Sequence, residues 1–343
     1  MSDVLESSQG GRFWPGFRKE VLACLRRCLL LGTSGSLVGL AGSGKSNLLT
    51  YIALYPEQVI PSERDFATTI VPIDLNHLVD RHPATLYRLI LRACFQVRTR
   101  FPDLVARRVT QIYDTYIASN DPFLAQTAVH ELLLAVAGTG GQLVLLLDQF
   151  DRFFRTASPE LTTALRGLRD SFKETVIYIV SMRQAAIFMP EAERLGDLPP
   201  MPGSHICWVG GMRPADAQLF LVQAAGRAGQ TVSPPQIERM LALTGGYASL
   251  LKAVSAWWLG EVAERPSAEL LVPEEWRAAL GQHHTVKKRL ERVGQGLTQE
   301  EQWLLGRVCL PEPQRWDGRA EEVLTRLAWR GLCEPGPAGW QIR

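Results

Sequence analysis

The stretch that decides the fold is residues 36–48, S-L-V-G-L-A-G-S-G-K-S-N-L. Within it, Gly39 to Ser46 fits the pattern G-x-x-x-x-G-K-[ST] at every fixed position. A short apolar strand, Ser36 to Val38, precedes the loop, and Asn47 to Leu54 has the composition of the helix that follows. A glycine-rich turn between a strand and a helix predicts a phosphate-binding loop.

The residue types of this loop suit a nucleoside triphosphate. Glycines permit backbone angles that point several N–H groups at phosphate oxygens, and the following helix presents its positive end. Lys45 is expected to neutralise the β- and γ-phosphates, and the Ser46 hydroxyl to bind Mg²⁺. We therefore expect ATP and Mg²⁺ as cofactors, with nucleotide contacts from Gly39, Gly42, Ser43, Gly44, Lys45, Ser46 and Asn47.

A second metal ligand is expected at the end of a neighbouring strand. In residues 143–151, L-V-L-L-L-D-Q-F-D, five apolar residues predict a buried strand, and Asp148 follows them directly. A carboxylate at this strand end can bind the magnesium ion. The next residue is Gln149, whose neutral amide can orient a water molecule but cannot take its proton. Asp151 could substitute as the base, or it could cap the next segment or pair with Arg152. We expect slow basal hydrolysis.

Further candidates for sensing the nucleotide follow a later strand. Residues 176–183, V-I-Y-I-V-S-M-R, place Ser181 and Arg183 at a strand end, where ligand groups gather in doubly wound sheets, although strand ends are often merely polar. Arg166 and Arg169 lie on the preceding helix. One could act across a subunit boundary, but a solvated helix face is favoured.

The chain-wide pattern predicts an α/β core. Continuous apolar strands at 36–38, 70–75, 143–147, 176–181 and 206–209 alternate with helices, which indicates a parallel sheet covered on both faces. After about Gly210 the pattern is helical. We predict an N-terminal segment and helix at 1–35, a P-loop core at 36–209, a helical lid at 210–272 and a C-terminal domain at 273–343, with a flexible start at 1–12 and a linker from Pro266 to Pro273.

Composition limits the class of protein. The 343 residues are 46% apolar with a net charge of +2, so two or three domains are expected and overall charge does not argue for nucleic acid. The six cysteines are scattered, and only Cys24 and Cys28 are close. We expect reduced packing cysteines and no metal site, as in a reducing cytoplasm. No signal peptide or apolar run of about 20 residues is present, so a soluble cytoplasmic protein without membrane contact is expected.

With these motifs in place, the chain resembles the STAND class of P-loop ATPases, within the AAA+ group and near the archaeal and initiator-type ATPases. The resemblance rests on the phosphate loop, on L-V-L-L-L-D-Q-F-D-R-F-F, on the Arg183 strand end and on L-T-G-G-Y-A-S-L-L-K at 243–252. In the last segment Ala248 replaces the usual proline, and Ser249 stands where initiators have a sensor arginine. Lys252 could reach the phosphates, although an exposed helix lysine is favoured.

The resemblance also implies roles for the two ends of the chain. The segment F-W-P-G-F-R-K-E occupies the place where relatives hold adenine, so Phe17 or Arg18 is a candidate, unless these residues start a packed helix. At the C-terminus, L-T-Q-E-E-Q-W-L-L, V-L-T-R-L-A-W-R-G-L-C and G-W-Q-I look like a winged helix-turn-helix.

DNA binding is one possible use of such a domain. Arg319, Arg326 and Arg330 on its expected recognition helix and the basic run 283–292 favour phosphate contacts, whereas Glu321 and Glu322 oppose them.

Two functions remain in view. The first is an ATP-dependent switch that controls assembly or a protein partner, for example in signalling or anti-phage defence, and oligomerisation is what the resemblance implies. The second is a DNA-acting AAA+ regulator of replication, plasmid maintenance or transposition target selection. A small-molecule kinase is disfavoured by the helical lid and the winged end.

Overall fold

The computed structural model describes residues 13–14, 16–60, 67–119, 121–189, 205–262, 273–310, 314–337 and 339–342. The chain forms two compact units that are discontinuous in sequence. Unit 1 comprises Met1–Lys19, Gly39–Gly44 and Trp208–Arg343, and unit 2 comprises Glu20–Val38 and Lys45–Cys207. The expected flexible start at 1–12 and the expected linker up to residue 272 lie outside the described residues. The four domain boundaries predicted above stay a prediction.

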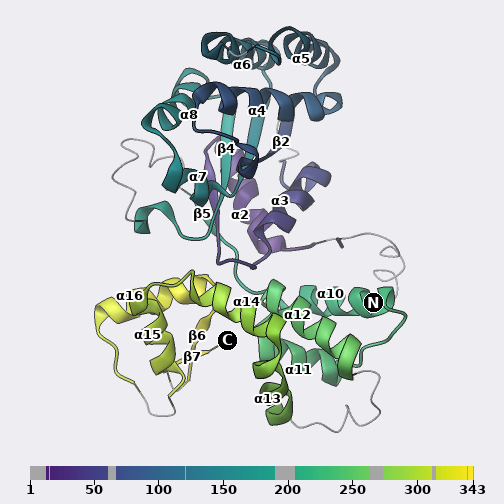
Figure 1. Cartoon of the computed structure of the whole chain (residues 1–343), viewed down its shortest axis with the longest axis vertical. Helices are drawn as coiled ribbons and strands as arrows, with labels where there is room; N and C mark the ends of the chain where they lie inside the picture. Colours follow the sequence, from purple (N-terminus) through teal and green to yellow (C-terminus); the bar gives the residue numbers. More distant parts are fainter. Residues whose placement is uncertain are drawn as a thin grey trace. The chain divides into compact units, whose positions relative to one another are not determined.

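Unit 2 is built on a five-stranded sheet whose strands follow the order β2-β3-β4-β1-β5. Figure 1 labels β2, β4 and β5 of this sheet and the helices around it. The strands are β1 (Gly35–Val38), β2 (Thr68–Asp74), β3 (Gln142–Asp148), β4 (Val176–Met182) and β5 (Ile206–Trp208). The neighbours β2 and β3, β3 and β4, and β4 and β1 pair in parallel. All five strands predicted from the apolar runs are present. Pro72 is tolerated in β2 because this strand lies at an edge of the sheet, where a missing N–H leaves no partner unsatisfied.

Helices cover this sheet, as the continuous burial of β3 and β4 requires. Contacts with strands come from α3, α4, α6, α7 and α8, while α5 packs on α4 and α6. The helices of unit 2 are α2 (Lys19–Leu30), α3 (Lys45–Leu54), α4 (Pro83–Gln96), α5 (Asp103–Tyr116), α6 (Pro122–Ala137), α7 (Phe150–Thr156) and α8 (Pro159–Ser171), with short 3-10 turns at Pro56–Gln58, Leu75–His77, Arg98–Arg100 and Ala186–Phe188. This architecture confirms the predicted parallel α/β P-loop core.

One helix of unit 2 was not predicted. Helix α7 begins directly after β3 and is only 7 residues long. It forms because Phe150, Phe153 and Phe154 recur at helical spacing and are all buried. Gln149 turns the chain from strand to helix with a positive φ of 59°. The turn cannot be inferred from residue type, because glutamine rarely adopts this conformation.

Unit 1 contains the helices that follow residue 210. These are α10 (Pro214–Arg227), α11 (Pro234–Thr244), α12 (Ala248–Trp257), a π-helical turn (Trp258–Val262), α13 (Pro273–Gln282), α14 (His284–Gly294), α15 (Gln299–Val308) and α16 (Gly318–Trp329). Helices α10, α11 and α12 pack on one another, and α12 also contacts α14. Their common core includes Met240, Leu251 and Trp276, which are fully buried.

The C-terminal part of unit 1 has a core of its own around Leu304, Leu324 and Leu327. Helices α15 and α16 are followed by the antiparallel hairpin of β6 (Cys333–Gly336) and β7 (Gly339–Ile342). This order agrees with the helices and hairpin expected from the sequence, while the winged-helix assignment stays a prediction.

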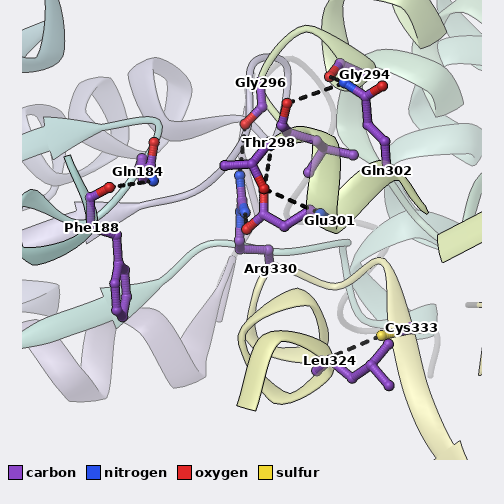
Figure 2. A network of polar contacts seen from close by, with 11 residues as sticks. Gln184, Phe188, Gly294, Gly296, Thr298, Glu301, Gln302, Leu324, Arg330 and Cys333 are labelled. Atoms are coloured by element: carbon purple, nitrogen blue, oxygen red, sulfur yellow. Dashed lines mark hydrogen bonds and ion pairs between the residues drawn. The ribbon is translucent and has the colours of Figure 1, made fainter. Parts of the chain in front are cut away.

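A buried ion pair locks α15 to the residue that ends α16. Arg330 and Glu301 are 3% and 5% exposed, and the guanidinium donates to Glu301 Oε1 at 2.6 Å and to the Gly296 carbonyl at 2.9 Å (Figure 2). The other Glu301 oxygen accepts the Thr298 backbone N–H at 2.9 Å, which completes a capping box. Arg330 was predicted as a candidate phosphate contact, but here its guanidinium is buried inside the protein.

The cysteines depart from expectation. Cys24 on α2 and Cys207 on β5 form a disulfide across a sequence separation of 183 residues. The prediction that all six cysteines are reduced packing residues is therefore wrong for this pair. Cys28, Cys94 and Cys333 are free and buried, and Cys309 is free and exposed. No sequence spacing could indicate the pair, because only the sheet order brings β5 near α2.

Candidate nucleotide-binding site

The phosphate loop connects β1 to α3, as predicted. Strand β1 ends at Val38 and helix α3 begins at Lys45. Gly42 and Gly44 have φ values of +85° and +101°, which residues with a Cβ atom rarely adopt. Lys45 is buried, whereas Ser46 is exposed at the first turn of α3. The loop thus ends at a helix N-terminus, where backbone N–H groups have no intrahelical partner and favour an anion.

The residues of this loop fit a bound phosphate. A Cβ atom at Gly39 would collide with the Val209 carbonyl, and one at Gly42 would collide with the Ser249 side chain, so the cradle requires glycine at both positions. The Ser43 hydroxyl is buried, and the phenol of Tyr247 is its polar neighbour. A phosphate group would supply oxygens for the backbone donors and for this hydroxyl.

Within unit 1, Arg18 holds the loop. Its guanidinium donates to the Ser43 carbonyl at 2.7 Å and to the carbonyls of Gly210 and Gly211 at 2.9 Å each. Arg18 itself is 5% exposed and has a positive φ of 55°. Three carbonyls around one planar guanidinium use its fixed donor geometry, which an ammonium cannot reproduce. The side chain is thus occupied by protein carbonyls, and its role as an adenine contact stays a prediction.

A segment near the start of α12 also contacts the loop. The Ser249 backbone N–H donates to the Gly42 carbonyl at 3.0 Å. Tyr247 is buried together with Leu40 and Val293 in one small cluster. Burial raises the pKa of the Tyr247 phenol well above its usual range, so the hydroxyl stays neutral. Lys252, the other candidate from this segment, is exposed on α12.

Other candidate site residues lie at the carboxyl ends of strands in unit 2. Asp148 is the last residue of β3 and is partly exposed. Leu147 pairs with Val180 and Leu37 with Ser181, so the registers place Ser181 between the end of β3 and the strand that enters the loop. The structure therefore gathers three elements that the sequence analysis assigned to one site.

A second carboxylate at this edge was missed. Asp74 ends β2 and lies in register with Asp148 on β3. Its carboxylate accepts the Asn76 backbone N–H at 2.9 Å. The run I-V-P-I-D-L contains the same pattern of apolar strand followed by Asp that singled out Asp148, and this pattern could have identified it.

Asp148 and the residues that follow it in the sequence make several polar interactions. The Asp148 carboxylate accepts the Gln149 backbone N–H at 2.8 Å. Asp151 is 4% exposed, and its Oδ2 lies 3.5 Å from Nε of Arg183 on the end of β4. The guanidinium of Arg152 donates instead to the Asn76 side chain at 3.1 Å. Asp151 therefore pairs with Arg183, a partner that was not among the predicted alternatives, whereas Arg152 bonds to Asn76; a role of Asp151 as the base stays a prediction.

The remaining candidate site residues contact other side chains of the protein. Arg166 and Arg169 both pair with Asp170, at 3.3 and 3.0 Å. Phe17 is 4% exposed and packs against the rings of Phe13 and Trp14 at centroid distances of 5.3 and 5.1 Å. The adenine and arginine-finger roles stay predictions.

Comparison with known families identifies the chain. The family profile described as Novel STAND NTPase 1 matches residues 17–332. The chain belongs to this family of STAND NTPases. It is therefore a P-loop NTPase related to the AAA+ ATPases, as the resemblance predicted, and its family implies nucleotide binding. No curated protein matches the sequence.

Solved structures share the fold at low identity. A Walker-type ATPase of Pyrococcus abyssi is 15% identical, with a TM-score of 0.53 over 95% of this chain and 92% of that chain. Cdc6p of Pyrobaculum aerophilum is 14% identical, with a TM-score of 0.48 over 99% and 92%. The ORC1 protein of Aeropyrum pernix, solved in complex with DNA, is 13% identical, with a TM-score of 0.45 over 99% and 92%. The first of these supports the fold of the whole chain.

Among the residues that the structure describes, no helix is both long enough and apolar enough to cross a bilayer.

Proposed function

We propose that this STAND NTPase binds ATP with Mg²⁺ in the loop Gly39–Ser46 and hydrolyses it slowly, as a switch whose nucleotide state controls domain arrangement, assembly and partner binding. The observation that carries the proposal is the loop itself, with two glycines at positive φ, two glycine positions where a Cβ atom would collide, and a helix N-terminus at Lys45. Family membership supports nucleotide binding.

Each residue has a separate task in this proposal. Lys45 neutralises the β- and γ-phosphates, and the N–H groups of the loop bind their oxygens. Ser46 and Asp148 hold Mg²⁺, directly or through water, and the ion supplies positive charge against the phosphate oxygens. Asp74, in register with Asp148, adds a second carboxylate that can hold water bound to the ion.

Slow hydrolysis is supported by the groups nearest the expected water molecule. Gln149 carries an amide, which orients water without accepting a proton. Asp151 is buried, and its carboxylate is engaged in an ion pair with the Arg183 guanidinium. We propose that this arrangement keeps ATP bound long enough for a partner to read its state.

The contacts of Arg18 support the proposal that a bound nucleotide affects the conformation of the rest of unit 1. One guanidinium joins the carbonyl of Ser43 in the loop to those of Gly210 and Gly211 at the start of the expected lid. A phosphate that changes the loop conformation alters these hydrogen bonds. A ligand that contacts two conformations differently shifts their populations, which is how a nucleotide acts as a switch.

The test is nucleotide binding by Lys45→Ala, measured by isothermal titration calorimetry, with Lys252→Ala as the matched control. Lys252 is exposed on α12, so its loss should leave the affinity within about twofold. Lys45→Ala should lower ATP affinity by at least about 100-fold. Wild-type affinity in Lys45→Ala would overturn the assignment of the loop.

Size-exclusion chromatography with light scattering tests the switch. The wild-type chain is compared with ADP, ATP and a non-hydrolysable ATP analogue. A change in mass or hydrodynamic radius that follows ATP and the analogue, but not ADP, is expected. Identical behaviour in all three states would contradict a nucleotide-dependent change of assembly or shape.

A DNA-acting regulator is the alternative. It is favoured by the exposed Lys287, Lys288 and Arg292 on α14. The expected recognition helix is a weaker candidate, because Arg319 pairs with Glu300 at 2.8 Å and Arg330 is buried against Glu301. Salt-sensitive duplex binding that weakens in a Lys287→Ala, Lys288→Ala double variant would favour this alternative, and absence of binding at low salt would remove it.

A further inference from the structure

Three cysteine sulfurs of unit 2 form one cluster. The Sγ atoms of Cys24, Cys28 and Cys207 all lie within 4.8 Å of one another. Cys24 and Cys28 come from the same face of α2, since they are four residues apart, and Cys207 comes from β5. Two of the three form the disulfide described above, and Cys28 carries a free thiol beside it.

The packing around the third thiol leaves room for its sulfur. Cys28 is fully buried, and Cys207 is 1% exposed. A Cβ atom at Gly35 would lie 3.1 Å from Cys28 Sγ, so the glycine in β1 provides the space that the thiol occupies. Cys24 is only partly buried, which gives the cluster one side open to solvent. A disulfide between two cysteines requires no third thiol at this distance.

We propose that, in the reduced chain, Cys24, Cys28 and Cys207 bind one thiophilic d10 metal ion, Cu⁺ or Zn²⁺, through three thiolates. Thiolate ligands select these ions over harder ones. With metal–sulfur distances of about 2.3 Å, three sulfurs around one ion lie about 4 Å apart, within the 4.8 Å span of the cluster. The open side at Cys24 suits a trigonal Cu⁺ site or a water molecule as the fourth ligand of Zn²⁺.

The position of the cluster on α2 favours a cation. Cys28 lies in the last turn of this helix, which ends at Leu30. The C-terminus of a helix carries partial negative charge, which stabilises a bound cation and disfavours three uncompensated thiolates. Reactive thiolates are typically found near helix N-termini, whereas Cys28 lies at a helix C-terminus, with Arg27 as its charged neighbour.

The disulfide is the oxidised, metal-free form of the same site. Metal binding releases one proton from each of the three thiols. When a small-molecule disulfide such as oxidised glutathione is the oxidant, the Cys24 and Cys207 sulfurs give up two electrons and join. The oxidant takes these two electrons from the thiolates and two protons from water, and becomes two thiols. The metal ion leaves because two of its ligands are lost, and the Cys28 thiolate takes up a third proton from water, which balances the three released on metal binding.

The experiment uses the full chain, reduced with a phosphine under anaerobic conditions and compared with the oxidised chain. In one arm Cu⁺ is supplied from a chromophoric Cu⁺ chelator, and in the other Zn²⁺ from a chromophoric Zn²⁺ chelator. We expect one ion per reduced chain in at least one arm, and none in the oxidised chain. The arm that competes better with its chelator identifies the ion.

Two matched variants separate this site from packing. Cys28→Ala should lower the metal affinity by more than about tenfold, since loss of a direct ligand exceeds loss of an outer partner. The variant should still form the Cys24–Cys207 disulfide on oxidation, which peptide mass spectrometry detects and which shows that the region folds. Cys94→Ala removes an equally buried cysteine from α4 and should bind as wild type. No uptake by the reduced wild type, or equal uptake by Cys28→Ala, would overturn the proposal.

Discussion

Replacing Arg330 by methionine should lower the free energy of unfolding of unit 1 by about 3 kcal/mol. The substitution keeps much of the side-chain volume but leaves Glu301 buried without its cation. Arg330 and Glu301 side chains are 4% and 6% exposed, so water cannot take over the lost contacts without local opening (Figure 2).

The magnitude follows from the contacts. The charge-assisted hydrogen bond to Glu301 contributes about 1.5–3 kcal/mol, and the bond to the Gly296 carbonyl contributes about 1 kcal/mol. Loss of one partner of a buried pair costs about 3–5 kcal/mol. The Thr298 N–H still binds the second oxygen of Glu301, which places the expected cost at the lower end of this range.

The assay is urea unfolding followed by tryptophan fluorescence. Eight of the nine tryptophans lie outside the sheet of unit 2, and only Trp208 ends one of its strands, β5, so the signal reports mainly unit 1. A second variant, Arg330→Met with Glu301→Leu, removes both charges and loses the capping box, which costs about 1 kcal/mol. It should be no less stable than the single variant. A cost below about 1 kcal/mol for Arg330→Met, or additive effects of the two substitutions, would refute the reasoning.

Three further predictions concern single residues. Gln149→Glu should raise basal ATP turnover by about 10- to 100-fold, because a carboxylate can accept the water proton, and a phosphate-release assay checks it; unchanged turnover would show that position 149 does not face the water. Arg18→Lys should lower the unfolding free energy by about 2 kcal/mol, since a single ammonium nitrogen cannot take the place of two guanidinium nitrogens that bind carbonyls of separate segments. Lys19→Arg, at the exposed neighbouring residue, is its control in the same urea assay. Trp14→Phe removes the 2.9 Å hydrogen bond to the buried Asp216 carboxylate and should cost about 1.5–3 kcal/mol by circular dichroism, whereas a change within about 0.5 kcal/mol would contradict it.

Much of the fold could be predicted because its determinants are local. The loop Gly39–Ser46 is set by glycines and a lysine within one turn, and the central strands β3 and β4 are apolar runs buried on both faces. Helices such as α4 and α6 begin at prolines that follow a capping residue. These features do not depend on distant parts of the chain.

The candidate site could be predicted only in part. Asp148 and Ser181 could be assigned to one edge of the sheet because they end apolar strands, and the same rule applied to Asp74 would have added it. The short helix α7 and the positive φ of Gln149 could not be predicted, since burial of three phenylalanines imposes them on residues with no local preference for the turn.

The sequence by itself determined the phosphate loop, the strand set and the family, because short motifs and apolar periodicity act over a few residues. Only the tertiary structure decided the partners: Arg183 for Asp151, three carbonyls for Arg18, Glu301 for Arg330 and Cys207 for Cys24. Each of these pairs joins residues far apart in the chain. Their contact depends on the order of strands and the packing of helices, which no single segment encodes.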